Sequence, residues 1–242
     1  VTDMYGKRHS GPSETAYQEL KERILHLELP PGAAISEIET AAQYDISRTP
    51  IRDVFKTLAA EGLLEIRPHI GTFVSLIDLH MISDILYIRE SLEQSVYKDL
   101  AGGYDKTQEP RIRRILQRQQ ELIESSLSPE ELSRAFIVTD NDFHYALYDM
   151  AGRGNVTNFL GLISSQYERF RTLINLGGKE YLKKLQKDHS SIFHFIATKQ
   201  YEELRQHISH HIYDGLQASA DIMNLHPEYF KSSENDRIKL SQ

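Results

Sequence analysis

The strongest constraint on the fold is a run of six segments, between Asp78 and Asn224, in which apolar residues recur at helical spacing. Short breaks, most of them containing glycine, serine or proline, separate these segments. The segments are 78–101, 109–125, 129–150, 155–175, 179–199 and 201–224. Because short links place consecutive helices side by side, we predict an all-α antiparallel bundle of about six helices.

The preceding residues have a different pattern, with three helical segments followed by two strand-like segments. Ser36 precedes Glu39 at the spacing of a capping box, and Ser47 is placed to cap the third helix, which Gly62 closes. The helices are expected at 14–29, 36–44 and 47–61, and the strands at 64–67 and 72–76. This order predicts an N-terminal winged helix-turn-helix domain in a mostly α-helical protein.

Composition narrows the possible functions. The 242 residues include no cysteine, so a metal ion would have to be held by His, Asp or Glu. No apolar run approaches 18 residues, and we expect a cytoplasmic protein that does not contact a membrane. The net charge is -7, and residues 1–75 carry 8 Lys and Arg against 11 Asp and Glu. Any contact with DNA must therefore depend on a few well-placed cations.

The start of the third helix carries a group of hydrogen-bond donors. Ser47, Arg48, Thr49 and Arg52 lie within its first two turns, and an apolar stripe follows on the opposite side. Each of these side chains can reach a phosphate or a base edge. The alternative is that the two arginines only form surface ion pairs with neighbouring aspartates. The combination favours a helix that contacts DNA.

The same region resembles a known family. The order of elements over residues 15–76, the run SRTPIRDVFKTLAAEGL and the GTFV hairpin resemble the GntR family of bacterial transcription regulators. The resemblance implies that double-stranded operator DNA is the partner. The residues that it implies for DNA contact are Arg48, Thr49 and Arg52, with Ser47 at the helix cap and His69 and Gly71 in the wing.

Two positions depart from the pattern of that family. Ile70 stands just before the wing glycine, where relatives often carry a basic residue. Ile38 stands near the start of the second helix, where many relatives carry an arginine. The contribution of the wing and of the second helix to DNA binding is therefore left open, although Gly71 still permits close approach of the backbone.

Helical geometry sorts the histidines of the bundle. Asp140 and His144 lie one turn apart on the inner face of one helix, and His189 and His211 lie on the inner faces of two others. One carboxylate with three imidazoles suits one divalent metal ion per chain, with zinc first and nickel or manganese as alternatives. A hydrogen-bonded core histidine is the alternative for each position. His194 and His210 are expected to face solvent.

The histidine spacing resembles a second pattern. The D-x-x-F-H run from Asp140 to His144, followed by His189 and by His211 after 22 residues, resembles the metal-binding pattern of the FCD (FadR C-terminal domain) subfamily. The resemblance covers residues 78–224. His207, one turn before His211, has no role in this pattern, and both support of the metal ligands and simple packing remain open.

Arg89 shares the inner stripe of the first bundle helix. An arginine in a protein interior needs an anion. Its partner is either Glu93, four residues later, or the carboxylate of an effector, the role that the FCD resemblance implies.

The expected protein is thus a homodimeric transcription regulator, a repressor, whose metal-containing bundle senses a small carboxylate metabolite. The expected parts are a flexible arm (1–13), a winged helix-turn-helix domain (14–76), a helical FCD domain for effector binding and dimerisation (77–224) and a polar, loosely packed tail (225–242). A metal-dependent hydrolase is the alternative function, because three histidines and an aspartate can activate water. A purely structural metal, with no effector, is a third possibility.

Overall fold

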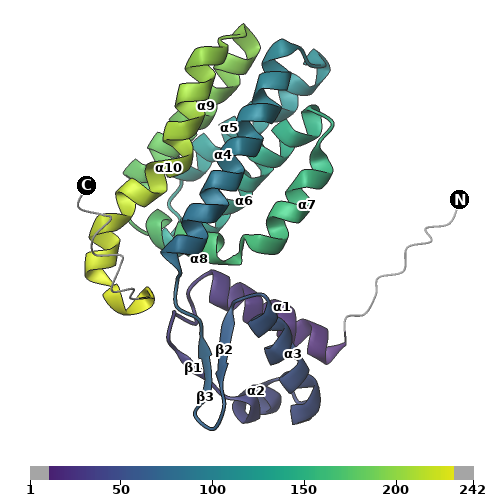
Figure 1. Cartoon of the computed structure of the whole chain (residues 1–242), viewed down its shortest axis with the longest axis vertical. Helices are drawn as coiled ribbons and strands as arrows, with labels where there is room; N and C mark the ends of the chain where they lie inside the picture. The colour runs from purple at the N-terminus through teal and green to yellow at the C-terminus, as the bar shows by residue number, and fades with distance from the viewer. Residues whose placement is uncertain (1–10, 232–242) are drawn as a thin grey trace, which may run out of the picture. The chain divides into compact units, whose positions relative to one another are not determined.

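The computed structural model describes residues 11–231, which form two compact units that meet in sequence between Leu76 and Ile77 (Figure 1). Each unit is described here by itself. Most of the expected arm at 1–13 and of the expected tail at 225–242 lies outside the described residues. Within 11–231, every helix falls short of the length and apolar character needed to cross a membrane.

The first unit is the expected winged helix-turn-helix. Its elements are α1 (Pro12–Leu25), β1 (Ala34–Ile35), α2 (Glu37–Gln43), α3 (Arg48–Ala60), β2 (Leu64–Arg67) and β3 (Gly71–Val74). The strands form an antiparallel sheet in the order β1-β3-β2, with Leu64 opposite Val74. β1 was not predicted, because a strand of two residues is too short to show an alternating pattern.

The core of this unit forms where α1 and α3 pack together. Leu20 and Ile24 of α1 meet the predicted apolar stripe of α3, and all are almost fully buried. The buried stripe residues are Ile51, Val54, Phe55 and Leu58. α1 begins at Pro12 and ends at Leu25, four residues earlier than predicted. The chain already turns at Leu27, which has a φ of 61°, before the prolines are reached.

In the described residues, the regular elements of the second unit are all helices, and a single β-bridge joins Ile77 to Phe230 (Figure 1). Its helices are α4 (Leu79–Gly102), α5 (Glu109–Glu124), α6 (Pro129–Met150), α7 (Gly154–Ile163), α8 (Ser165–Asn175), α9 (Lys179–Thr198) and α10 (Tyr201–Leu225), with short 3₁₀ helices η1 (Lys106–Gln108) and η2 (Pro227–Tyr229). Local signals explain several starts. The Ser128 hydroxyl and the Glu131 carboxylate form a reciprocal capping box at α6, and the Asp78 carboxylate caps α4.

The helix predicted over 155–175 is wrong in one respect, because the structure contains two helices there. α7 and α8 meet at Ser164, whose hydroxyl donates to the carbonyl of Gly161 at 3.2 Å. α8 has eight buried residues, whereas α7 has none. The bend lets α8 enter the core while α7 stays outside it. The apolar period continues through the bend, so it could not reveal the break.

The chain after α10 also differs from the expected loose tail, as far as residue 231. Phe230 is buried, and the backbone around it pairs with Ile77 at the start of the unit. The amide of Ile77 donates to the carbonyl of Tyr229 at 2.8 Å, and the amide of Lys231 donates to the carbonyl of Ile77 at 2.9 Å. Residues 226–231 therefore pack against the beginning of α4.

Candidate metal centre

Three histidines from three helices meet inside the second unit. His144 of α6, His189 of α9 and His211 of α10 are all buried, and His189 is 0% exposed. One ring nitrogen from each lies within 4.8 Å of the other two. The ring centroids are 4.9 to 5.5 Å apart. The fold thus brings together the imidazoles that the inner helix faces predicted.

Asp140, the fourth residue of the predicted set, lies close to two of the histidines. Its Oδ1 lies 3.4 Å from Nε2 of His189, and its Oδ2 lies 3.9 Å from Nε2 of His144. The same Oδ2 accepts a hydrogen bond from Nη2 of Arg171 at 2.6 Å. Asp140 therefore lies beside two of the three imidazoles, those of His144 and His189.

The orientation of His189 is set by Gln119 of α5. The Gln119 amide nitrogen donates to the carbonyl of Thr139 at 3.2 Å, so its oxygen faces Nδ1 of His189 at 3.0 Å. Nδ1 must then carry the proton, which leaves a lone pair on Nε2. That Nε2 is buried and has no hydrogen-bond partner among the described residues.

His144 has the same arrangement, and His211 differs from it. Nδ1 of His144 lies 2.9 Å from the Tyr97 hydroxyl and 3.3 Å from Glu93 Oε2, and its Nε2 also lacks a hydrogen-bond partner in the described chain. Nδ1 of His211 lies 3.8 Å from Asp188 Oδ2. Oxygen atoms that lie beside Nδ1 commonly orient the histidine ligands of metal ions. In His144 and His189 a buried Nε2 is thus left without a hydrogen-bond partner, whereas in His211 the buried nitrogen without a partner is Nδ1.

His207, whose role the sequence left open, contacts Asp188 in the structure. Its Nε2 lies 3.3 Å from Asp188 Oδ1, while the other oxygen of Asp188 faces His211. Burial on its own raises the pKa of Asp188, but His207 and His211 outweigh this effect and hold the pKa below its usual range. Asp188 is therefore an ionised link between His207 and the histidine cluster.

Electrostatics favour the metal-binding forms of these side chains. Burial holds the pKa of His189 well below its usual value and lowers that of His144 despite the nearby Glu93. Burial acts to raise the pKa of Asp140, but Arg171 and His189 outweigh it, so the net shift is downward. Neutral imidazoles and an ionised carboxylate are the forms that bind a divalent cation.

Arg89 pairs with Glu93, the internal partner that the sequence offered as one of two alternatives. Its Nε and Nη2 donate to Glu93 Oε1 at 3.0 and 2.8 Å, and its Nη1 donates to the Tyr167 hydroxyl at 2.7 Å. Three of the five N–H groups of the guanidinium are used in this way, so two remain.

Two cavities adjoin this centre. A small one, of about 30 Å³, and a large one, of about 340 Å³, are both lined by Arg89, His144, Tyr167 and Arg171. Sequence reasoning missed Arg171. The sequence indicated only that a buried Asp140 requires a cation close to its carboxylate. It did not show which arginine supplies that cation.

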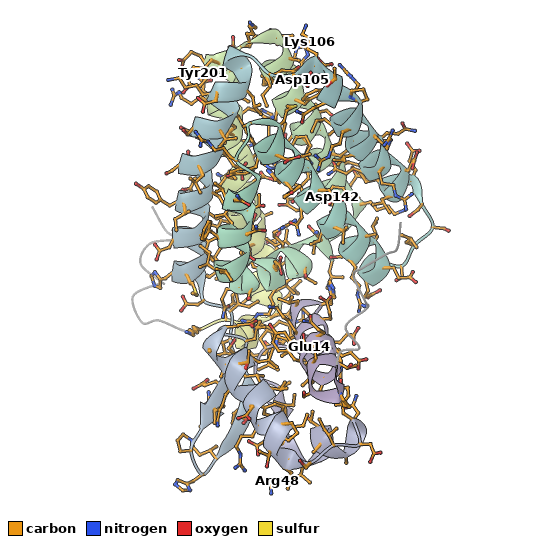
Figure 2. All side chains as sticks on the ribbon, turned by 90° about the vertical axis from the view of Figure 1, so that its right-hand side faces the viewer. Glu14, Arg48, Asp105, Lys106, Asp142 and Tyr201 are labelled. Atoms are coloured by element: carbon orange, nitrogen blue, oxygen red, sulfur yellow. The ribbon has the colours of Figure 1, made fainter. Side chains whose placement is uncertain are left out.

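The predicted DNA-contacting residues lie in the first unit. Ser47, Arg48, Thr49 and Arg52 are all exposed, and Arg48 is labelled in Figure 2. The arginines do not pair with the neighbouring aspartates. Both lie 3.4 Å from Oε2 of Glu37, at the start of α2. Ser47 occupies the cap position of α3, but its side chain makes no capping hydrogen bond, contrary to expectation.

The wing is the turn between β2 and β3. His69 has a φ of 61° and Gly71 a φ of 152°, so both adopt backbone conformations that a tight turn requires. Ile70 and Ile38 are both exposed. Arg67, which sequence reasoning did not single out, places its guanidinium 4.8 Å from the centre of the Phe73 ring.

Comparison with known proteins gives two family matches. The profile described as bacterial regulatory proteins, gntR family, matches residues 12–74, and that of the FCD domain matches residues 84–214. A transcriptional regulator from an unstable DNA locus of Streptomyces ambofaciens is 36% identical over 157 residues, which are 65% of this chain and 64% of that protein. The repressor RspR of Escherichia coli K12 is 29% identical over 139 residues, 57% of this chain and 59% of that protein.

The matches thus span less than two thirds of the length of these relatives. Among solved structures, E. coli McbR/YncC has a TM-score of 0.65 at 16% identity and covers 91% of this chain and 99% of its own, which shows a shared fold. The relatives are transcriptional regulators and not enzymes, so the hydrolase alternative has no support.

Proposed function

We propose that this protein represses transcription as a homodimer, and that a metal ion and a small carboxylic acid control its binding to DNA. The chain belongs to the gntR family of bacterial regulatory proteins and carries an FCD domain. The observation that carries the sensing part is the group of buried ring nitrogens without hydrogen-bond partners, Nε2 of His144, Nε2 of His189 and Nδ1 of His211, beside an ionised carboxylate. Unsatisfied buried nitrogens are costly, and a cation at their centre removes that cost.

The proposed metal ligands are Asp140, His144, His189 and His211. Zinc fits three imidazoles and a carboxylate, and nickel or manganese accept the same donors. The bound ion supplies positive charge that attracts a carboxylate group. Gln119, Glu93 and Asp188 keep the three rings oriented from the side of Nδ1.

Arg89 is the proposed anchor for the acid. Two of its N–H groups remain after it has bound Glu93 and Tyr167, and it lines both cavities beside His144. An arginine that is already held by a buried acid is ordered before the ligand arrives, which lowers the entropy cost of binding. The metal ion and Arg89 then hold the acid at two points.

The DNA-binding part of the proposal depends on α3. Arg48, Thr49 and Arg52 reach base edges, Ser47 contacts phosphate, and the wing around His69 and Gly71 approaches the adjacent groove. Two copies of α3 held at fixed spacing bind paired half-sites of an operator. The acid acts by favouring one arrangement of the two heads, because a ligand with equal affinity for both arrangements changes nothing.

Metal analysis and calorimetry test the sensing part. His189→Ala is expected to lose most of the metal, while His194→Ala, on the exposed side of the same helix, retains it. Arg89→Ala is expected to keep the metal and lose at least tenfold in affinity for acetate. Full metal content in His189→Ala contradicts the metal assignment, and unchanged acetate affinity in Arg89→Ala contradicts the anchor.

Selection from random DNA duplexes tests the regulatory part. The full chain is expected to enrich a palindromic sequence and to bind it as a dimer in sedimentation experiments. Gel-shift titrations with and without the acid then measure the coupling. A metal that is structural only predicts an operator affinity that no acid changes.

A further inference from the structure

The large cavity in the second unit is too spacious for the head group of an acid alone. Its volume is about 340 Å³, and its walls come from α4, α6, α7 and α8. At about 30 Å³ per water molecule, this space holds roughly ten non-hydrogen atoms. A ligand that uses only a carboxylate would leave most of the cavity to water.

The end of the cavity near His144 is polar, and its lining contains two arginines and the carboxylate of Glu93. Arg89, Arg171 and His144 line it, and Tyr148 adds a hydroxyl group. Tyr148 is 1% exposed, and its hydroxyl has no hydrogen-bond partner among the described residues. Burial and the nearby Glu93 raise the pKa of Tyr148, so this hydroxyl remains a donor. This buried hydroxyl of a cavity-lining residue is thus a donor without an acceptor among the described residues.

Another part of the wall is formed by α7, which contributes one large apolar side chain, that of Leu160. Thr157, Leu160 and Gly161 lie three and four residues apart, on the face of α7 that lines the cavity. Each of the other helices α4 to α10 has at least four buried residues, whereas α7 has none. Leu160 therefore faces the cavity instead of a protein core, and an apolar ligand body would bury it.

Acidic side chains line another part of the cavity. Asp142, which is exposed and labelled in Figure 2, and Glu168 both contribute to its wall. Negative charge at this position disfavours a second carboxylate on the ligand.

We infer that the large cavity binds a monocarboxylic acid with an apolar body of about six to eight carbon atoms, its carboxylate beside Arg89 and Tyr148 and its body against α7. This inference rests on the proposed function and names the class of ligand for that site. It distinguishes such acids from short hydroxy acids, sugar acids and dicarboxylates.

Calorimetric titration of the zinc-loaded full chain with four acids provides the test. Benzoate, with a single carboxylate and a six-carbon ring, is expected to bind at least tenfold more tightly than acetate, because each buried carbon removes apolar surface from water. Adipate, with a second carboxylate, and gluconate, with a polar chain, are expected to bind no more tightly than acetate.

Variants on the two sides of α7 locate the apolar body. Leu160→Ala is expected to weaken benzoate binding about five- to tenfold and to leave acetate binding within about twofold. Phe159→Ala is the matched control, because Phe159 lies on the same helix but is 68% exposed and does not line the cavity. Tyr148→Phe is expected to weaken both acids about three- to tenfold, since the hydroxyl serves the carboxylate.

The outcomes separate this inference from the proposed function. If acetate binds in a zinc-dependent manner but benzoate is no tighter, or if gluconate or adipate is the tightest ligand, the inference is wrong and the proposed function stands. Equal effects of Leu160→Ala and Phe159→Ala on benzoate also contradict it. If none of the acids binds the zinc-loaded protein, both the inference and the effector part of the proposed function fail.

Discussion

At the scale of single residues, one carboxylate forms ion pairs with both arginines that are expected to contact DNA. Glu37 lies 3.4 Å from Arg48 and from Arg52, whose side chains are about half exposed. Exposed ion pairs at such distances contribute little to stability. Their effect here is on binding, because the guanidinium groups must leave Glu37, or share it, when they contact a base or a phosphate.

Substitution of Arg52 and of Glu37 should therefore change DNA affinity in opposite directions. Arg52→Ala is expected to weaken operator binding by about 1 to 3 kcal/mol, the range for a bidentate contact with a base. Glu37→Gln is expected to tighten binding, because it frees both arginines and removes a negative charge close to the DNA. Gel-shift titration at several salt concentrations measures both effects.

Arg23→Ala, on α1 of the same unit, is the control for these titrations and is expected to bind operator DNA normally. Weaker binding by Glu37→Gln would show that Glu37 positions the arginines for DNA instead of competing with it. Equal affinity of Arg52→Ala and the parent chain would remove α3 from the reading role.

Asp188 is a second residue whose importance comes from what it orients. Asp188→Asn removes the negative charge that faces Nδ1 of His211 and the side chain of His207. Loss of such a partner typically costs 10- to 100-fold in metal affinity, and we expect zinc binding to weaken by about this factor. Competition with a chromophoric chelator measures it. Lys187→Ala, at the exposed neighbouring position, should bind zinc like the parent, and equal affinities for all three proteins would contradict the role of Asp188.

At the scale of elements, the start of α4 performs two tasks. The Asp78 carboxylate accepts hydrogen bonds from the amides of His80 and Met81, and so caps the helix. The same carboxylate accepts a hydrogen bond from Nζ of Lys231 at 3.0 Å, which attaches the segment after α10. One side chain thus joins the first and last described parts of the second unit.

The charge of Asp78 makes part of this stability dependent on pH. Burial on its own raises the pKa of Asp78, but the hydrogen bonds from Lys231 and from the amide of Met81 outweigh it, so the pKa in the folded protein is below its usual value. The unfolded chain therefore takes up the proton first as the pH falls. The contribution of the charge is complete above the unfolded pKa of about 3.9 and is lost as the pH falls through the folded pKa.

Asp78→Asn isolates this contribution, because asparagine caps a helix as well as aspartate does. At pH 7 the variant is expected to have a lower free energy of unfolding, by less than about 1 kcal/mol, since the pair with Lys231 is partly exposed to solvent. The difference from the parent chain should shrink as the pH falls below about 4. Urea unfolding at pH 7, 5 and 3.5 measures it, and a difference that does not change with pH would show that the charge is not responsible.

At the scale of the whole molecule, the two units have separate cores and separate chemistry. The core between α1 and α3 is aliphatic and aromatic, whereas the second unit contains the buried histidines, aspartates and arginines. A metal ion at the histidine cluster connects α6, α9 and α10, which lie far apart in sequence. We therefore expect a bound metal ion to raise the free energy of unfolding of the second unit and to leave that of the first unit unchanged.

Calorimetric scans of the full chain with zinc and with a chelator test this separation. At a free zinc concentration of 100 times Kd, the second unit is expected to gain about 2.7 kcal/mol in free energy of unfolding. The transition of the second unit should move to higher temperature, while that of the first unit stays in place. His189→Ala should show no zinc-dependent shift. A shift of both transitions, or of neither, would contradict a metal site confined to the second unit.

The sequence by itself determined which way the key side chains face. The helical period alone decides which residues share a face, so it placed Asp140, His144, His189 and His211 on inner faces. Their binding of a metal ion remains a prediction. The order of helices, turns and strands in the first 76 residues likewise determined the winged helix-turn-helix, because caps and turns are set by residues close together in the chain.

Only the tertiary structure decided which faces meet and what lies between them. Arg171 contacts Asp140, and Glu37 contacts both arginines of α3, because helices distant in sequence pack at particular distances. The bend at Ser164 and the large cavity beside α7 arise in the same way, from how all the side chains of the unit fill its volume. The local period of apolar residues predicts the face of the helix on which each side chain lies. It does not predict the distance of that side chain from another helix, because this distance depends on the packing of the whole core.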